Sequence, residues 1–129
     1  MIDVVHAFSG FSVNDLDAAR DFYGKSLGLD IRDGGMGNLE LVLPGGHTVF
    51  LYPKPNHEPA TFTVLNFVVE DIDAAVSALN DAGVVTKIYD DPDLHTDDRG
   101  IARGKELGYG PDIAWFTDPA GNVLSVLTA

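Results

Sequence analysis

The segment from Phe11 to Ala19 returns 56 residues later, from Phe67 to Ala75. Six of the nine paired positions are identical, and the pair Leu16 and Ile72 is nearly isosteric. Such a repeat constrains the fold strongly, because both copies must build the same supersecondary unit. Two copies in a chain of 129 residues predict a duplicated half-domain, since a solenoid needs at least three repeats.

Each copy of the repeat reads as an apolar strand followed by a helix. Asp15 and Asp71 are suited to the N-cap position, where a side-chain oxygen accepts a hydrogen bond from the first turn. Gly28 and Gly83 are suited to the left-handed position that ends a helix. Apolar residues recur between these signals with a period of about 3.6 residues. The two stripes are Leu16, Ala19, Phe22, Tyr23 and Leu27, and Ile72, Ala75, Val76, Leu79 and Ala82.

Short apolar stretches separated by turn signals follow each helix, so each copy reads as βαβββ. The sequence therefore predicts an α+β fold with mixed sheets in one domain, 1–129. Module one spans about 1–53, the proline-rich linker about 53–60, and module two about 61–129. Strands are expected at about 4–13, 29–33, 38–43, 47–53, 62–69, 84–88, 112–117 and 122–128.

Module two also contains a long segment without hydrophobic periodicity, at about 89–111. We expect either a flexible, solvated loop or a lid over a pocket. Arg103 within it is expected to be solvated or to meet an anionic group of a ligand.

Charge excludes several classes of partner. Twenty acidic residues against eight basic ones give a net charge of −12, which repels nucleic acid and anionic membranes. The acidity serves solubility or attracts a cationic ligand. The first residues lack the features of a signal peptide, and no apolar run has the length of a membrane span, so a cytoplasmic location is expected. The chain has no cysteine and therefore no disulfide, thiolate nucleophile or Cys-based zinc site.

The stretch from Val13 to Tyr23, followed by Leu27-Gly28-Leu29, resembles the opening of the vicinal-oxygen-chelate superfamily. That superfamily includes glyoxalase I, the extradiol dioxygenases and the bleomycin-resistance proteins. The turn from Asp118 to Asn122 resembles its closing hairpin. The resemblance covers the chain apart from the 89–111 segment. It implies two tandem βαβββ modules whose curved mixed sheets surround a cup-shaped pocket, often in a homodimer.

The resemblance also implies where a metal would be held. Enzymatic members bind a divalent ion through His and Glu side chains on four strands. The matching positions are Phe8, Val64 and approximately Phe50 and Ser125, which offer no suitable ligand set. A register slip of two residues brings in His6 but restores no such set. We therefore expect no metal centre and no cofactor.

The same strands carry the predicted ligand site. Phe8, Phe50 and Tyr52 are expected on one side of their strands, with Asn66 and Ser125 facing the same cup. An apolar pocket with a few polar groups is typical of a small-molecule site, although the rings also suit a core. Trp115 is a core residue or a pocket wall. The full predicted set is Phe8, Phe50, Tyr52, Val64, Asn66, Trp115 and Ser125.

No catalytic residue is predicted, because the sequence has no nucleophile elbow and its four histidines lack metal-binding spacing. The first hypothesis is a metal-free protein that binds or sequesters an organic small molecule, a cation being one candidate. The alternative is a divalent-metal-dependent lyase, isomerase or dioxygenase of the glyoxalase type, with its metal held elsewhere. A third is an interaction module without a ligand.

Overall fold

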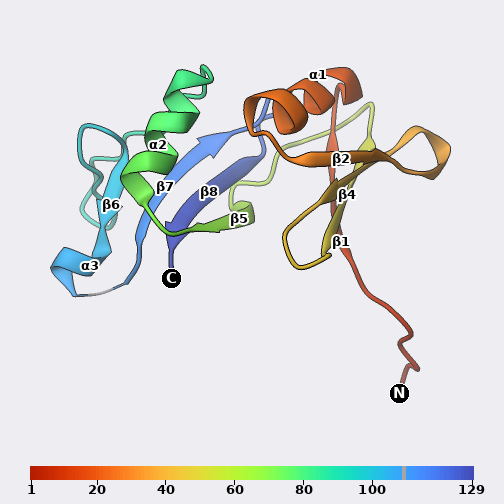
Figure 1. Cartoon of the computed structure of the whole chain (residues 1–129), viewed down its shortest axis with the longest axis horizontal. Coiled ribbons are helices and arrows are strands. Elements are labelled where there is room, and N and C mark those ends of the chain that lie inside the picture. Colours follow the sequence, from red (N-terminus) through yellow and green to blue (C-terminus); the bar gives the residue numbers. More distant parts are fainter. Residues whose placement is uncertain (109) are drawn as a thin grey trace. The chain divides into compact units, whose positions relative to one another are not determined.

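Each repeat copy builds one four-stranded mixed sheet with a helix packed against it (Figure 1). The computed structural model of the chain describes residues 1–108 and 110–129. The described residues divide into unit 1, Met1–Pro59, and unit 2, Ala60–Ala129. The predicted α+β fold of two tandem βαβββ modules is confirmed.

Sheet A lies in unit 1 and has the strand order β1-β4-β3-β2. β1 runs parallel to β4, and the other pairs are antiparallel. The elements are β1 (Ser9–Val13), α1 (Leu16–Asp21), the π-helical turn η1 (Phe22–Ser26), β2 (Asp30–Asp33), the 3₁₀ turn η2 (Gly35–Gly37), β3 (Leu39–Val42) and β4 (Thr48–Pro53).

Sheet B lies in unit 2 and repeats this topology in the order β5-β8-β7-β6. β5 runs parallel to β8, and the remaining pairs are antiparallel. The elements are β5 (Thr63–Val69), α2 (Ile72–Asp81), β6 (Ile101–Arg103), α3 (Gly104–Leu107), β7 (Asp112–Thr117) and β8 (Val123–Thr128).

The two long helices begin in the same way. The Ala18 backbone N–H donates to Asp15 at 3.1 Å, and the Ala74 N–H donates to Asp71 at 3.0 Å. Both caps were predicted, and each satisfies an amide that has no partner within its helix. Gly28 and Gly83 have φ of 70° and 83°, as expected for residues that follow a helix end.

Alternation along the strands gives each sheet two distinct faces. The face toward the helix is apolar and buried, and we call the opposite side the far face. Helix-face residues include Leu39, Leu41, Val49 and Leu51 in sheet A, and Ala114, Phe116, Leu124 and Val126 in sheet B. α1 packs on one face of sheet A and α2 on one face of sheet B, so side chains on the far faces do not take part in helix packing.

The hairpin before the last strand of each unit uses one turn geometry. In unit 1, Leu43 N–H donates to His47 O and Gly46 N–H to Leu43 O. In unit 2, Asp118 N–H donates to Asn122 O and Gly121 N–H to Asp118 O. Unit 2 adds side-chain bonds, because Asp118 accepts from the N–H groups of Ala120 and Asn122.

Two strand predictions and one loop prediction need correction. The first strand begins at Ser9 and not near residue 4, and the preceding segment is exposed and extends away from sheet A (Figure 1). Segment 84–88 is not a strand, although Lys87 N–H donates to Trp115 O. The segment 89–111 is not irregular throughout, since it contains β6 and α3.

The side chain of Asp97 explains why β6 forms where periodicity showed nothing. Its Oδ1 accepts from the backbone N–H groups of Arg99 and Ile101, both at 2.9 Å. The Gly100 N–H donates to Asp97 O, closing a tight turn directly before β6. A three-residue strand held by one aspartate leaves no hydrophobic pattern to detect. None of the helices in the described ranges is long and apolar enough to cross a bilayer.

Candidate functional site

Three predicted ring residues form a row in unit 1, which we call the aromatic row. The ring centroids of Phe8 and Phe50 are 6.1 Å apart with an edge-to-face tilt of 72°, and Phe50 stacks on Tyr52 at 5.7 Å and 26°. Phe8 is 64% exposed and Tyr52 36%. Large rings with this exposure are not core residues, so unit 1 by itself does not use the row for core packing.

A missing side chain makes room for the middle ring of the row. Gly10 is paired with Phe50 across β1 and β4. A Cβ on Gly10 would meet the Phe50 carbonyl oxygen at 2.9 Å and two Phe50 side-chain carbons at 3.2 and 3.3 Å. The Phe50 side chain therefore lies close against the Gly10 backbone, which holds it in place in the row.

Polar groups lie beside the row on the far face of sheet A. Glu40 is paired with Phe50 across β3 and β4, and its carboxylate lies 3.1 Å from the Arg32 guanidinium. Ser12 is paired with Tyr52, and its hydroxyl lies 2.6 Å from Nδ1 of His57. The rings are therefore flanked by a charge pair and by a hydroxyl–imidazole pair.

Three other predicted residues form a row on the far face of sheet B, across β5, β8 and β7. The pairing places Ser125 between Asn66 and Trp115. The Ser125 hydroxyl is fully buried and donates to Asn66 Oδ1 at 2.5 Å. The Trp115 ring meets Tyr89 edge-to-face at 5.5 Å. Tyr89 is not among the predicted site residues, because it lies in a segment without hydrophobic periodicity.

The positions matched to the family's metal ligands are not paired with one another across the strands. Phe50 pairs with Gly10 and Ser125 with Asn66, whereas Phe8 precedes β1. Val64 lies at an irregularity between Thr63 and Leu65 and has no register partner on β8. Within residues 1–108 and 110–129, no three His, Asp or Glu side chains are grouped so that they would hold an ion. The residues present do not fit the divalent ion that enzymatic relatives use.

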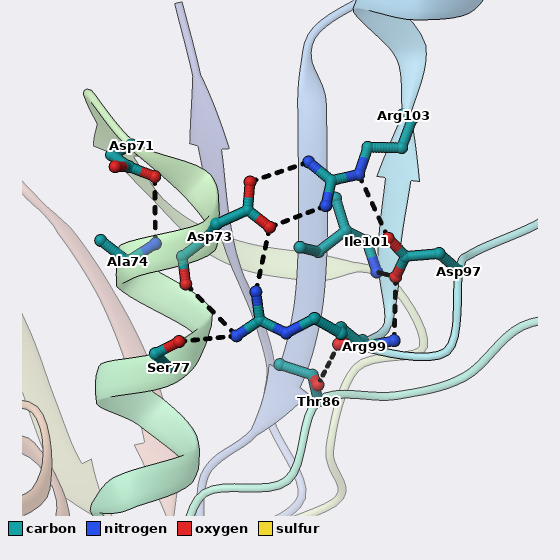
Figure 2. Close-up of polar contacts among 9 residues, drawn as sticks. All are labelled: Asp71, Asp73, Ala74, Ser77, Thr86, Asp97, Arg99, Ile101 and Arg103. Carbon is teal, nitrogen blue, oxygen red and sulfur yellow. Dashed lines mark hydrogen bonds and ion pairs between the residues drawn. The ribbon is translucent and has the colours of Figure 1, made fainter.

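Unit 2 also contains an ionic cluster, formed by Asp73, Asp97, Arg99 and Arg103 (Figure 2). Arg103 donates two hydrogen bonds to the Asp73 carboxylate, at 2.7 and 3.1 Å, and one from Nε to Asp97 at 3.1 Å. Arg99 donates to Asp73 Oδ1 at 2.9 Å and to Ser77 Oγ at 2.7 Å. Arg103 was expected to be solvated or to meet a ligand, and the structure corrects this because its guanidinium is held by two carboxylates.

Charge pairing shifts the titration of the cluster. Hydrogen bonds from Arg103, reinforced by the charges of both arginines, hold the pKa of Asp73 below its ordinary value. Partial burial tends to raise the pKa of Asp97, but hydrogen bonds from Ile101, Arg99 and Arg103 outweigh it, so this pKa is also lowered. The hydrogen bond to Asp73 is the largest cause that raises the pKa of Arg103. The two arginine charges balance the two aspartate charges, and their ion pairs connect β6 to the start of α2.

A shallow depression of about 430 Å³ lies in unit 2, beyond the end of α2. Its lining includes Asn80, Val84, Ile88 and Asp98. None of the predicted ligand-site residues lines it. The aromatic row in unit 1 and the Asn66–Ser125–Trp115 row in unit 2 therefore remain two separate candidate sites.

The fold and these rows define a class of small α+β proteins built from paired βαβββ modules. A sequence profile of the family described as Glyoxalase/Bleomycin resistance protein/Dioxygenase superfamily matches residues 4–126. The chain belongs to this superfamily, which confirms the predicted family. No functionally curated protein matches the chain at a significant level.

Solved structures share the fold at low sequence identity. TnmS3, an antibiotic-binding protein from a Streptomyces species, is 24% identical with a TM-score of 0.65, and the match covers 98% of each chain. A glyoxalase/dioxygenase from Nostoc punctiforme is 18% identical with a TM-score of 0.66, covering 99% of this chain and 98% of that one. The fosfomycin resistance protein FosX from Listeria monocytogenes is 12% identical with a TM-score of 0.69, covering 100% and 95%. Likeness at this level establishes the fold.

Proposed function

We propose that this protein binds an organic small molecule on the far faces of its sheets, without a metal ion, and sequesters it without changing it. The observation that carries the proposal is the aromatic row, in which Phe8, Phe50 and Tyr52 present linked rings to the surface of unit 1. Rings held at fixed spacing stack on planar or aromatic ligands. The net charge of −12 raises the local concentration of a cationic ligand.

Two further observations support binding over catalysis. The positions that the family resemblance matches to metal ligands are Phe8, Val64 and approximately Phe50 and Ser125, and none of these residues is a histidine or a glutamate. A protein of the same fold, TnmS3, is described as binding an antibiotic. Sequestration requires affinity and shape, and no group on the protein has to react.

The test is a thermal-shift screen against planar organic cations and neutral planar compounds, followed by calorimetric titration of each hit. A ligand at 100 times its dissociation constant adds about 2.7 kcal/mol to stability. We expect Phe50→Ala and Tyr52→Ala to weaken binding by roughly three- to tenfold each. Phe62→Ala is the matched control, because Phe62 is 69% exposed and lies outside the row.

Two results would refute the proposal. One is that no compound in the screen binds, or that every compound that binds has the same affinity for wild type and for the Phe50→Ala and Tyr52→Ala variants. The other is chemical change of the bound compound, read by mass spectrometry after release. Elemental analysis of protein purified without a His tag adds a third check, since one tightly held divalent ion per chain favours the glyoxalase-type enzyme.

A further inference from the structure

The amide of Asn66 is held in one orientation by the buried Ser125. The Ser125 hydroxyl donates to Asn66 Oδ1, and Ser125 is 0% exposed, so water does not reach the donor of this bond. An amide is planar, and its oxygen and nitrogen point in different directions from the same trigonal carbon. Fixing the oxygen toward Ser125 therefore points Nδ2 of Asn66 away from β8.

The two N–H groups on Nδ2 have no acceptor among the other described residues. Asn66 is exposed, so these donors are accessible within unit 2. The far face around them is largely apolar, with Val68, Leu127 and Ile113 in the next row across the sheet. A single oriented polar group in apolar surroundings is the usual arrangement for fixing how a small molecule lies in its site.

The ring of Trp115 lies at the other end of the row. Asn66 on β5 and Trp115 on β7 lie on either side of β8, since Ser125 on β8 pairs with both. Two strand spacings correspond to about 9.5 Å. A planar ligand of about two fused rings with one substituent spans this distance.

From this geometry we propose that the ligand is a planar aromatic compound of two or three rings with a neutral hydrogen-bond acceptor, such as a carbonyl oxygen, at one end. The carbonyl accepts from Asn66 Nδ2, and the ring system lies against Trp115. A carboxylate or phosphate fits less well, because the net charge is −12 and Arg99 and Arg103 are held by Asp73. The inference rests on the proposed function and specifies the ligand class for the far face of sheet B, within unit 2.

The test uses two probes that differ in one atom position. 2-Acetylnaphthalene carries a carbonyl, and 2-isopropenylnaphthalene has CH₂ in place of the oxygen. Equilibrium dialysis gives the dissociation constant of each probe. The ratio of the two constants is then compared between wild type and each variant, because the difference in hydrophobicity between the probes is the same for every protein and cancels. Asn66→Asp keeps an oxygen to accept from Ser125 but removes both N–H donors. Asn80→Asp, at an exposed residue of α2, adds the same charge elsewhere.

We expect the preference for the ketone to fall by roughly three- to tenfold in Asn66→Asp, which is the loss of one uncharged hydrogen bond. Asn80→Asp should retain the wild-type ratio. Ser125→Ala, which removes the positioning hydroxyl, should lower the ratio by a smaller factor. In ¹⁵N-labelled wild-type protein, the side-chain amide signals of Asn66 should shift with the ketone and not with the hydrocarbon.

An unchanged ratio in Asn66→Asp overturns the inference, as does wild-type protein that binds neither naphthalene. Both results leave the proposed function standing if another compound binds through Phe50 and Tyr52. If no planar compound binds at all, the inference and the proposed function fail together.

Discussion

Arg103 at the end of β6 donates two hydrogen bonds to the carboxylate of Asp73 in the first turn of α2, at 2.7 and 3.1 Å. Thirty residues separate the two in sequence. The negative charge of Asp73 interacts favourably with the positive end of the α2 dipole, as that of its repeat partner Asp17 does in α1. Only the copy in unit 2 has arginine partners among the described residues.

The repeat supplies its own control for this ion pair. Asp73→Asn and Asp17→Asn each remove one negative charge from a first helical turn, but only Asp73→Asn also breaks the contacts with Arg99 and Arg103. We expect Asp73→Asn to lower the urea unfolding midpoint more than Asp17→Asn. Equal shifts in the two variants would show that the arginines add nothing to the stability of unit 2.

Acid should remove the contribution of the cluster. The pKa values of Asp73 and Asp97 are lowered from the ordinary 3.8 by hydrogen bonds and nearby positive charge. A lowered carboxyl pKa stabilises the fold above the unfolded-state value, and this stability is lost as pH falls through the folded-state value. The difference in unfolding free energy between wild type and Asp73→Asn should be constant from pH 7 to 5. It should shrink below pH 3.8, and a change between pH 7 and 5 would contradict this.

Gly10 should not tolerate a side chain, because Phe50 occupies the space. Gly10→Ala places a Cβ 2.9 Å from the Phe50 carbonyl oxygen, so the two strands must shift. Crowding of this kind costs about 1–3 kcal/mol in unfolding free energy, measured by chemical denaturation. Gly35→Ala is the control, because nothing lies within 4 Å of its added Cβ. Equal stability of the two variants would refute the close contact.

Asp118 should stabilise the last hairpin of unit 2. Its carboxylate accepts from the backbone N–H groups of Ala120 and Asn122 and from the Asn122 side chain, at 2.8–3.0 Å, and Asp118 is 4% exposed. Asp118→Ala leaves these donors without that acceptor and should cost about 1–3 kcal/mol in unfolding free energy. Asp98→Ala, at an exposed aspartate, controls for the lost charge. An Asp118 variant as stable as this control would contradict the role.

The repeat in the sequence determined the βαβββ modules, both helix caps and the apolar helix faces. These features depend on contacts within a few residues and on the 2.0 and 3.6 periodicities that the order of residues displays directly. The positions matched to metal ligands came from the resemblance to the superfamily, and the residues that occupy them were read from the sequence. Alternation along the strands suggested that Phe8, Phe50 and Tyr52 share one side, and their rings do lie next to one another in the structure. Whether the seven predicted residues bind a ligand stays a prediction.

Tertiary structure decided the features that depend on partners distant in the chain. It selected Ile101–Arg103 over segment 84–88 as the outer strand of sheet B, because Asp97 organises the turn and Asp73 holds the two arginines. It also placed Ser125 beside Asn66, since strand register is set by pairing across the sheet. Hydrogen bonds and ion pairs between segments 26 to 59 residues apart leave no periodic trace in the sequence, so only the folded chain reveals them.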